Sequence, residues 1–216
     1  MTESLREKIY QSIRDAITYG KLSPGEHLVE SKLAEQFKAS RSPIREALRQ
    51  LGSEGLITFE RNKGITVTKL SIQEIEEIFS LRWLLESYAA RLSTEQATRN
   101  HSAYLRDLHK KMKVSAKAFD LMGWLQNNTL FHKFFSEHSG NGNLHQILET
   151  LKRRVYRYRQ ITVRIPGHFD DYDKHHEGIL RGYETKDGEM AEKYMKLHIV
   201  TIREVLIDYL SKFPGF

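Results

Sequence analysis

The sequence predicts a mainly α-helical chain in two parts: three helices and a β-hairpin first, then an all-α helical bundle. Apolar residues recur at helical spacing up to about residue 51, and two β-prone runs joined by a polar turn follow at 56–59 and 65–68. Beyond Thr68 no strand-like alternation is seen, which favours a bundle of six or seven helices. Residues 69–71 form a short junction, so we expect domains over 1–70 and 71–216.

Composition limits the classes of function before any motif is considered. The 216 residues are 39% hydrophobic and 29% charged, as in a globular protein, and they include no cysteine, which excludes disulfides and thiolate metal sites. No apolar run is long enough to span a bilayer and no signal-peptide core is seen, so we expect a cytoplasmic protein without a membrane partner. A net charge of +6 favours an anionic partner.

The first two helices follow from the spacing of their apolar residues. Leu5, Ile9 and Ile13 recur every four residues and predict an amphipathic helix that ends at Gly20. A second short helix is expected from about Ser31.

The third helix is predicted from its start signals and its buried stripe. Ser42 is a good N-cap, and Pro43 fits the first helical position, where a missing N–H costs nothing. Ile44, Leu48 and Leu51 lie at i, i+4 and i+7 and should be buried together.

Another face of this helix carries an arginine at every fourth residue: Arg41, Arg45 and Arg49. Guanidinium groups can bind guanine O6 and N7 bidentately or clamp phosphates, so this stripe is typical of a helix that reads the major groove of double-stranded DNA. A solvated basic face is the alternative that this helix leaves open. Three helices followed by a hairpin make a winged helix-turn-helix, whose wing tip at Lys63 can touch DNA or stay solvated.

Four spaced motifs cover nearly all of the first seventy residues: GKLSPG at 20–25, LAE at 33–35, SRSPIREAL at 40–48 and EGLI at 54–57. Together they resemble the N-terminal signature of GntR-family transcriptional regulators. The resemblance implies that Arg41 and Arg45 contact DNA and that Gly64 in the wing approaches the minor groove, while helical spacing adds Arg49 as a phosphate contact. Some members of the family carry an arginine at the start of the second helix, where this chain has Ser31. One expected DNA contact is therefore missing, and the operator sequence stays open. The expected DNA-binding residues are Arg41, Ser42, Arg45, Arg49, Lys63 and Gly64.

Histidines at three places in the second part are candidate metal ligands. Asn128 and His132 lie four residues apart and should share one helix face, and His176 and His198 lie on two further expected helices. Each of these three histidines is flanked by apolar residues that would turn it inward. A bundle interior rich in imidazole suits Zn²⁺ or Ni²⁺, although a single buried or surface histidine is more often only structural.

The second part also carries motifs of its own, at 81–86, 131–132, 139–141, 176–180 and 195–198. They match the pattern of the FCD effector domain found in the FadR subfamily. The resemblance implies a metal bound by an acidic residue and three histidines, which correspond here to Asn128, His132, His176 and His198. Because Asn128 replaces the acidic residue, the set has no anionic protein ligand. Either metal affinity falls, or an effector carboxylate supplies the missing charge.

In such domains the effector is a small carboxylate held by the metal or by nearby arginines. Arg82 on an apolar helix is the best candidate for a carboxylate clamp, and an internal ion pair with Glu86 is its alternative. Arg157, in the Tyr/Arg-rich segment 153–159, is a second expected effector-binding residue.

The resulting hypothesis is a homodimeric transcriptional regulator that reads an inverted-repeat operator and responds to a carboxylate effector. Two alternatives remain. In one, the metal is itself the signal. In the other, the histidines serve a metal-dependent hydrolase with a base such as Glu177, but no H-E-x-x-H pattern is present.

Overall fold

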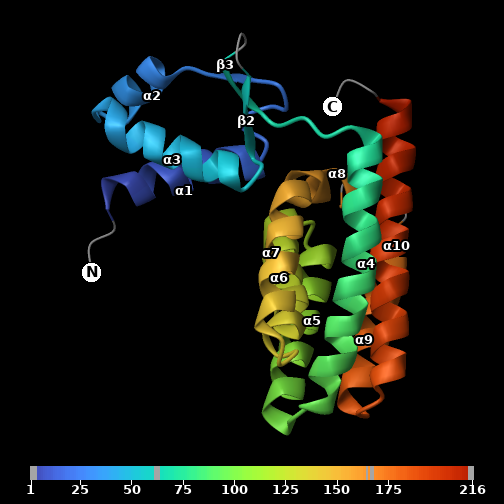
Figure 1. Ribbon diagram of the computed structural model, residues 1–216. Coiled ribbons are helices and arrows are strands. Elements are labelled where there is room, and N and C mark those ends of the chain that lie inside the picture. Colours follow the sequence, from blue (N-terminus) through green and yellow to red (C-terminus); the bar gives the residue numbers. More distant parts are fainter. Residues whose placement is uncertain (1–3, 61–63, 164, 166–167, 214–216) are drawn as a thin grey trace. The chain divides into compact units, whose positions relative to one another are not determined.

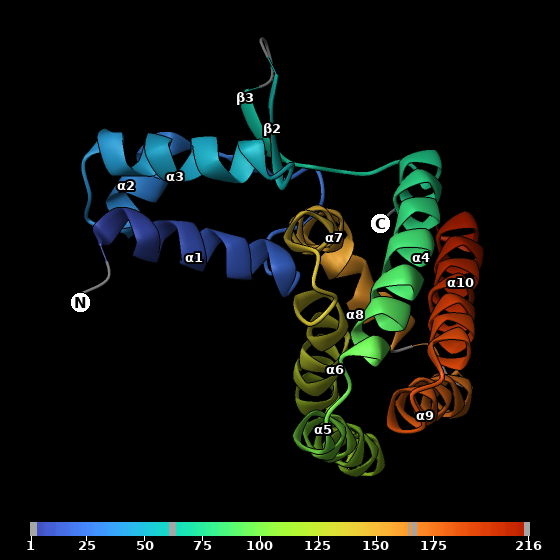
Figure 2. The ribbon, with the colours of Figure 1, turned by 60° about the horizontal axis from the view of Figure 1, so that its bottom comes forward.

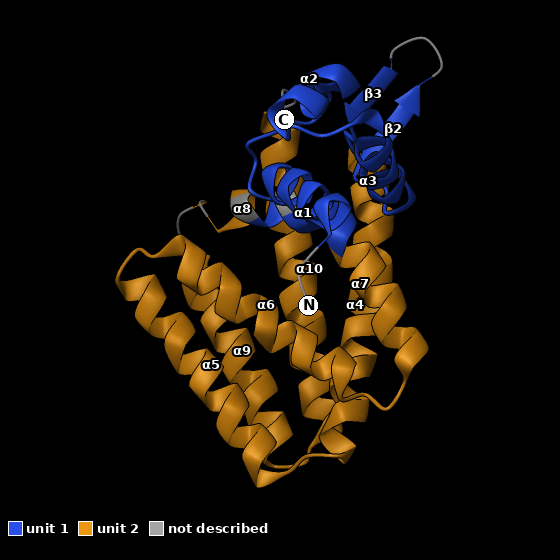
Figure 3. Cartoon of the chain, turned by 90° about the vertical axis from the view of Figure 1, so that its left-hand side faces the viewer, with its two compact units in different colours: residues 1–71, 153–160, 214–216 blue, residues 72–152, 161–213 orange. Residues whose placement is uncertain are grey.

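The computed structural model describes residues 4–60, 64–163, 165 and 168–213, which form two compact units (Figure 3). Unit 1 comprises the chain up to Ser71 together with residues 153–160, and unit 2 comprises residues 72–152 and 161–213. Among the described helices, none has both the length and the apolar character needed to cross a membrane.

Unit 1 contains three helices and a small antiparallel sheet. Its elements are α1 (Leu5–Thr18), β1 (His27–Leu28), α2 (Glu30–Gln36), α3 (Arg41–Ser53), β2 (Ile57–Glu60) and β3 (Gly64–Val67). The helices and the sheet share one apolar core, in which Ile44, Leu48 and Leu51 of α3 are fully buried. The expected winged helix-turn-helix is therefore confirmed.

The sheet has one strand more than the sequence predicts. Its order is β1-β3-β2, so β3 lies in the middle and pairs antiparallel with both neighbours. β1 is only two residues long and pairs His27 with Thr66 and Leu28 with Ile65. A run this short has no alternation that could be recognised in the sequence.

The start of α3 differs from the expectation. The helix begins at Arg41, and the preceding Ser40 has the extended backbone of an N-cap. Ser42 lies inside the first turn, and its hydroxyl contacts the Glu46 carboxylate at 3.3 Å. The N-cap prediction at Ser42 was therefore wrong by two residues, because Ser40 and Ser42 both precede an apolar-periodic run and either can begin a helix.

Unit 2 is built of helices alone among the described residues, as predicted. They are α4 (Ile72–Glu95), α5 (Arg99–Lys117), α6 (Leu121–Glu137), α7 (Gly142–Val155), α9 (Phe169–Glu184) and α10 (Gly188–Lys212). After α7 come a short 3-10 turn (Tyr156–Tyr158), which falls in the stretch 153–160 counted with unit 1, and α8 (Arg159–Thr162), which begins in that stretch. The long helices α4 and α10 run side by side, α9 packs on α10, and α5 pairs with α6 (Figures 1 and 2).

The close contact of α9 with α10 depends on a glycine. A Cβ atom added at Gly182 would lie 2.6 Å from the Ala191 backbone nitrogen, a distance that real Cβ atoms do not adopt. Glycine at this position lets the two backbones approach. The approach brings together α9, which carries His176, and α10, which carries His198.

Candidate metal centre and nucleic-acid interface

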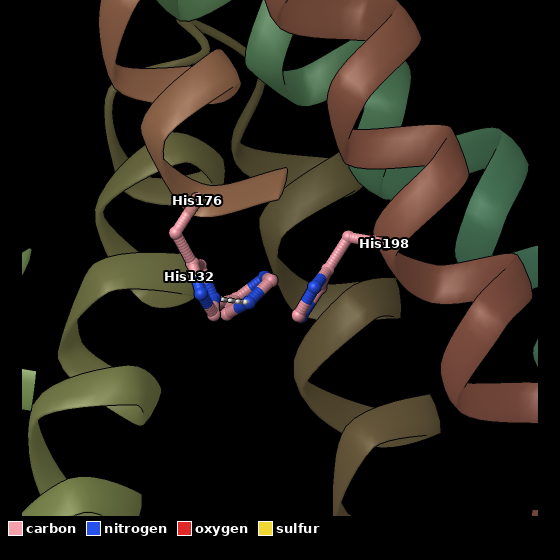
Figure 4. A group of neighbouring side chains, drawn as sticks. All are labelled: His132, His176 and His198. Carbon is pink, nitrogen blue, oxygen red and sulfur yellow. Dashed lines mark hydrogen bonds between the residues drawn. The ribbon is translucent and has the colours of Figure 1, made fainter. Parts of the chain in front are cut away.

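Three histidines from three helices of unit 2 meet in its interior (Figure 4). His132 lies on α6, His176 on α9 and His198 on α10, and each side chain is at most 4% exposed. One ring nitrogen from each can be chosen so that all three lie within 4.8 Å of one another. We call these three residues the histidine cluster. The sequence placed them on three helices, and the fold brings them together.

One distance inside the cluster matches the ligand spacing of a tetrahedral cation. The Nε2 atoms of His132 and His176 lie 3.3 Å apart. Ligand nitrogens about 2.05 Å from a tetrahedral zinc ion are separated by about 3.3 Å. Imidazole nitrogens are ligands for both Zn²⁺ and Ni²⁺. The residues present therefore fit a transition metal, and none of the donors in the cluster is a carboxylate.

Asn128 lies one turn before His132 on α6, on the same face of the helix. Its side chain is 2% exposed, and its Oδ1 atom is buried without a hydrogen-bond partner. A buried amide oxygen without a partner is costly, because its hydration is lost and not replaced. A cation or a polar ligand in the neighbouring site would satisfy this oxygen.

A second layer of charged side chains surrounds His132. Glu86 of α4 is 2% exposed, and its Oε2 atom lies 3.3 Å from His132 Nδ1. Its Oε1 atom accepts from the Arg82 guanidinium at 2.8 Å, and Lys152 Nζ lies 3.5 Å from Oε2. Burial alone would raise the pKa of the Glu86 carboxyl, but Arg82, Lys152 and His132 hold it well below its usual range.

The sequence did not identify Glu86 and Lys152 as parts of this site. Glu86 was named only as a partner for Arg82, and that ion pair is present. The one available signal was a carboxylate at i+4 from an arginine on a strongly apolar helix, which indicates a buried pair but not its neighbours. The effector-binding role of Arg82 stays a prediction. The side chain of Arg157 lies outside the described residues.

The histidine cluster keeps at least one of its rings uncharged at neutral pH. Burial lowers the pKa of His176 well below its ordinary value of 6.5, and the nearby rings of His132, His109 and His175 lower it further. A neutral imidazole offers a lone pair, so a metal ion does not have to displace a proton from His176 at pH 7.

This shift predicts that the metal-free chain loses stability in mild acid. Because the pKa of His176 is lower in the folded than in the unfolded chain, only the unfolded chain takes up this proton as the pH falls below 6.5. The free energy of unfolding should therefore fall below that pH, by up to about 1.4 kcal/mol per pH unit from this group. Urea unfolding at pH 7.5 to 5.5, with H176Q as control, measures it. An equal slope in H176Q would contradict the assignment to His176.

The arginine stripe of α3 faces solvent in unit 1. Arg41, Arg45 and Arg49 are all exposed, opposite the buried face of the helix. Arg45 also contacts Glu30 of α2 at 2.9 Å, with its side chain 55% exposed, so that DNA phosphates or bases would have to compete with one carboxylate. Such exposed pairs contribute about 0–1 kcal/mol and are readily exchanged.

Of the two wing residues in the expected DNA-binding set, Gly64 is among the described residues. Gly64 begins β3 with a φ of 79°, in the left-handed region that favours glycine, and no atom lies within 4 Å of a Cβ built there. Lys63 lies outside the described residues. The DNA-contacting roles of the whole set stay predictions.

Comparison with known families assigns both parts of the chain. Residues 5–67 match the family described as bacterial regulatory proteins, gntR family, and residues 77–201 match the FCD domain. These two matches agree with the resemblances carried by the motifs. They cover unit 1 up to the last strand and most of unit 2.

Known proteins similar to the whole chain are transcriptional regulators. The repressor RspR of Escherichia coli is 26% identical over 94% of this chain and 89% of its own length. The gluconate operon repressor of Bacillus licheniformis is 30% identical over 84% of this chain and 76% of its own length. The solved structure of E. coli McbR/YncC superposes with a TM-score of 0.82 over 97% of this chain and 99% of that one, at 23% identity, which supports the fold.

Proposed function

The chain belongs to the GntR family of bacterial transcriptional regulators and carries an FCD domain, and we propose that a small carboxylate controls its affinity for operator DNA. Like its relatives, it is a DNA-binding regulator and not an enzyme. We assign DNA binding to residues 1–70, and effector binding and dimerisation to residues 71–216. The effector site is the histidine cluster with its bound metal.

The proposed DNA interface is the arginine stripe of α3 together with the wing. Helix α3 would lie in the major groove with Arg41 and Arg45 at base edges or phosphates and Arg49 at a phosphate. A homodimer would place two such helices on an inverted repeat. Exposed apolar side chains on one helix of unit 2 support self-association: Leu81, Leu84 and Tyr88 of α4 are each between 46% and 52% exposed and lie at i, i+3 and i+7.

The observation that carries the effector proposal is the convergence of three buried imidazoles without a carboxylate among them. The histidine cluster and Asn128 would hold Zn²⁺ or Ni²⁺, which when bound supplies a Lewis-acidic cation for a carboxylate oxygen. All four side chains are neutral ligands, so they leave the charge of the ion uncompensated. An anionic ligand is therefore favoured over a neutral one.

The charges next to the histidine cluster favour an anion as well. The buried negative charge of Glu86 is balanced by two cations, Arg82 and Lys152. This second layer therefore leaves the ion without a full negative counter-charge. A carboxylate effector supplies the charge that an acidic residue at position 128 would otherwise provide.

Control of DNA binding requires that the effector bind one dimer geometry better than another. A preference of about 1.4 kcal/mol changes operator affinity tenfold. The relative from B. licheniformis represses a gluconate operon, so gluconate is one of the carboxylates to be tested. A regulator for which the metal itself is the signal is the second candidate, since the cluster alone can hold an ion.

One titration tests the proposal. We expect zinc-loaded protein to change its affinity for a duplex selected from random DNA at least tenfold when one of acetate, succinate, citrate or gluconate is added. Zinc-free protein should respond weakly or not at all. Fluorescence anisotropy at fixed ionic strength measures the affinity, because DNA binding depends on salt. A response to zinc without any carboxylate would favour the metal sensor. No response to either would contradict both candidates.

A further inference from the structure

We propose that Glu86 is a positioning residue of the metal centre, whose carboxylate faces Nδ1 of His132, holds the ring proton on that nitrogen and leaves Nε2 of the ring for the ion. The inference rests on the proposed function, because it concerns the same centre. It places beside the ligand set a residue of a fourth helix, α4, that does not itself ligate the metal.

The two ring nitrogens of His132 face different surroundings. Nε2 points to the cluster, 3.3 Å from Nε2 of His176. Nδ1 points to α4, 3.3 Å from Glu86 Oε2. A neutral imidazole carries one proton, and an ionised carboxylate can only accept. Glu86 therefore favours the tautomer with the proton on Nδ1, which leaves the lone pair of Nε2 directed into the cluster.

Glu86 is itself held in place. Both the Nε and Nη2 atoms of Arg82 lie 2.8 Å from Oε1, which fixes one edge of the carboxylate. The other oxygen remains for His132, with Lys152 Nζ at 3.5 Å. A buried carboxylate fixed in this way can orient an imidazole ring, whereas a solvated one would rotate freely.

Glu86 belongs to a second layer and not to the ligand set. Among the described residues, the group of donors that lie within 4.8 Å of one another consists of the three histidines. The Oε2 atom of Glu86 faces Nδ1 of His132, and the ligating Nε2 is the other nitrogen of that ring. A carboxylate beside a ligating histidine makes the imidazole a stronger donor, which offsets part of what the cluster loses by having Asn128 in place of an acid.

Zinc affinity in E86Q tests this role. We expect E86Q to bind Zn²⁺ about 10- to 100-fold more weakly than the wild-type chain, the usual effect of losing such a partner. Competition with a chromophoric chelator measures the affinity, with Zn²⁺ alone as the probe. E76Q, an exposed glutamate on the same helix, is the matched control and should bind as the wild type does.

The tautomer of His132 supplies a readout that general damage to the fold would not reproduce. In the metal-free wild-type chain, two-bond ¹H–¹⁵N correlation spectra should show the His132 proton on Nδ1, assigned by comparison with H132Q. In E86Q this preference should weaken, while His27, exposed in unit 1, keeps its spectrum. If E86Q does not fold, R82Q/E86Q replaces it, because this variant removes both members of the ion pair and leaves neither of them as an unpaired buried charge. The His132 tautomer in the wild-type spectrum tests the inference without any Glu86 variant.

Two results would overturn the inference: zinc affinity of the folded E86Q or R82Q/E86Q variant within twofold of wild type, or a His132 proton on Nε2 in the metal-free wild-type chain. A wild-type chain that binds no zinc would overturn the metal centre itself, and the inference with it. The wild-type zinc titration therefore separates failure of the proposed function from failure of the role given to Glu86.

Discussion

The double variant R41A/R45A is expected to lose sequence-specific operator binding while it remains folded. Both guanidinium groups are exposed on α3, opposite the face that packs into the core of unit 1. Removing a side chain that binds a base edge bidentately costs about 1–3 kcal/mol, so the pair should cost about 2–6 kcal/mol, or roughly 30-fold to 10⁴-fold in affinity. Anisotropy titration of the selected duplex measures the loss.

The control must remove the same charge elsewhere. K110A/K117A also removes two positive charges, from exposed positions on α5 in unit 2. It should keep specific binding, apart from a small loss at low salt. Thermal unfolding of R41A/R45A should match the wild type, because exposed substitutions usually change stability by less than about 0.5 kcal/mol. Undiminished specific binding by R41A/R45A would remove both residues from the reading role.

The double variant H132A/H176A is expected to lose stoichiometric metal. These two residues supply the Nε2 atoms that lie 3.3 Å apart, so the variant removes the pair whose spacing fits the ion. At a thousandfold excess of Zn²⁺ over its dissociation constant, binding stabilises the folded chain by about 4.1 kcal/mol. Zinc should therefore raise the unfolding temperature of the wild-type chain and leave that of the variant unchanged.

H27A/H145A removes the same number of imidazoles outside the histidine cluster and serves as the control. His27 lies on β1 in unit 1, and His145 on α7 contacts the Ser136 hydroxyl. This variant should keep both its metal content and its thermal response to zinc. Elemental analysis after dialysis measures the metal content of both variants. One zinc per chain retained by H132A/H176A would contradict the ligand set.

The fold was predictable because its main elements are long and periodic. The buried stripe of α3 and the β-hairpin are visible as local patterns, and both are present. β1 was missed because its two residues are ordered by pairing with β3 and have no pattern of their own. The start of α3 was misplaced because Ser40 and Ser42 carry the same local signal.

The sequence predicted that the site residues lie on several helices, but not how these residues are arranged in space. His132 and His176 are 44 positions apart in the chain, and their 3.3 Å contact depends on how α6 and α9 pack. The contact between Glu86 and His132 could not be predicted for the same reason, since tertiary packing decides which side of α4 meets His132. The spacing of residues within one helix says which side chains share a face, but it does not say what that face meets.

Anomalous diffraction at the zinc edge from crystals of the zinc-loaded wild-type chain would locate the bound ion. We expect a single strong peak in unit 2, about 2.0–2.1 Å from the imidazole nitrogens of His132, His176 and His198, with Glu86 at Nδ1 of His132 and outside bonding distance to the ion. A peak bound by other residues, or no peak inside unit 2, would contradict this expectation.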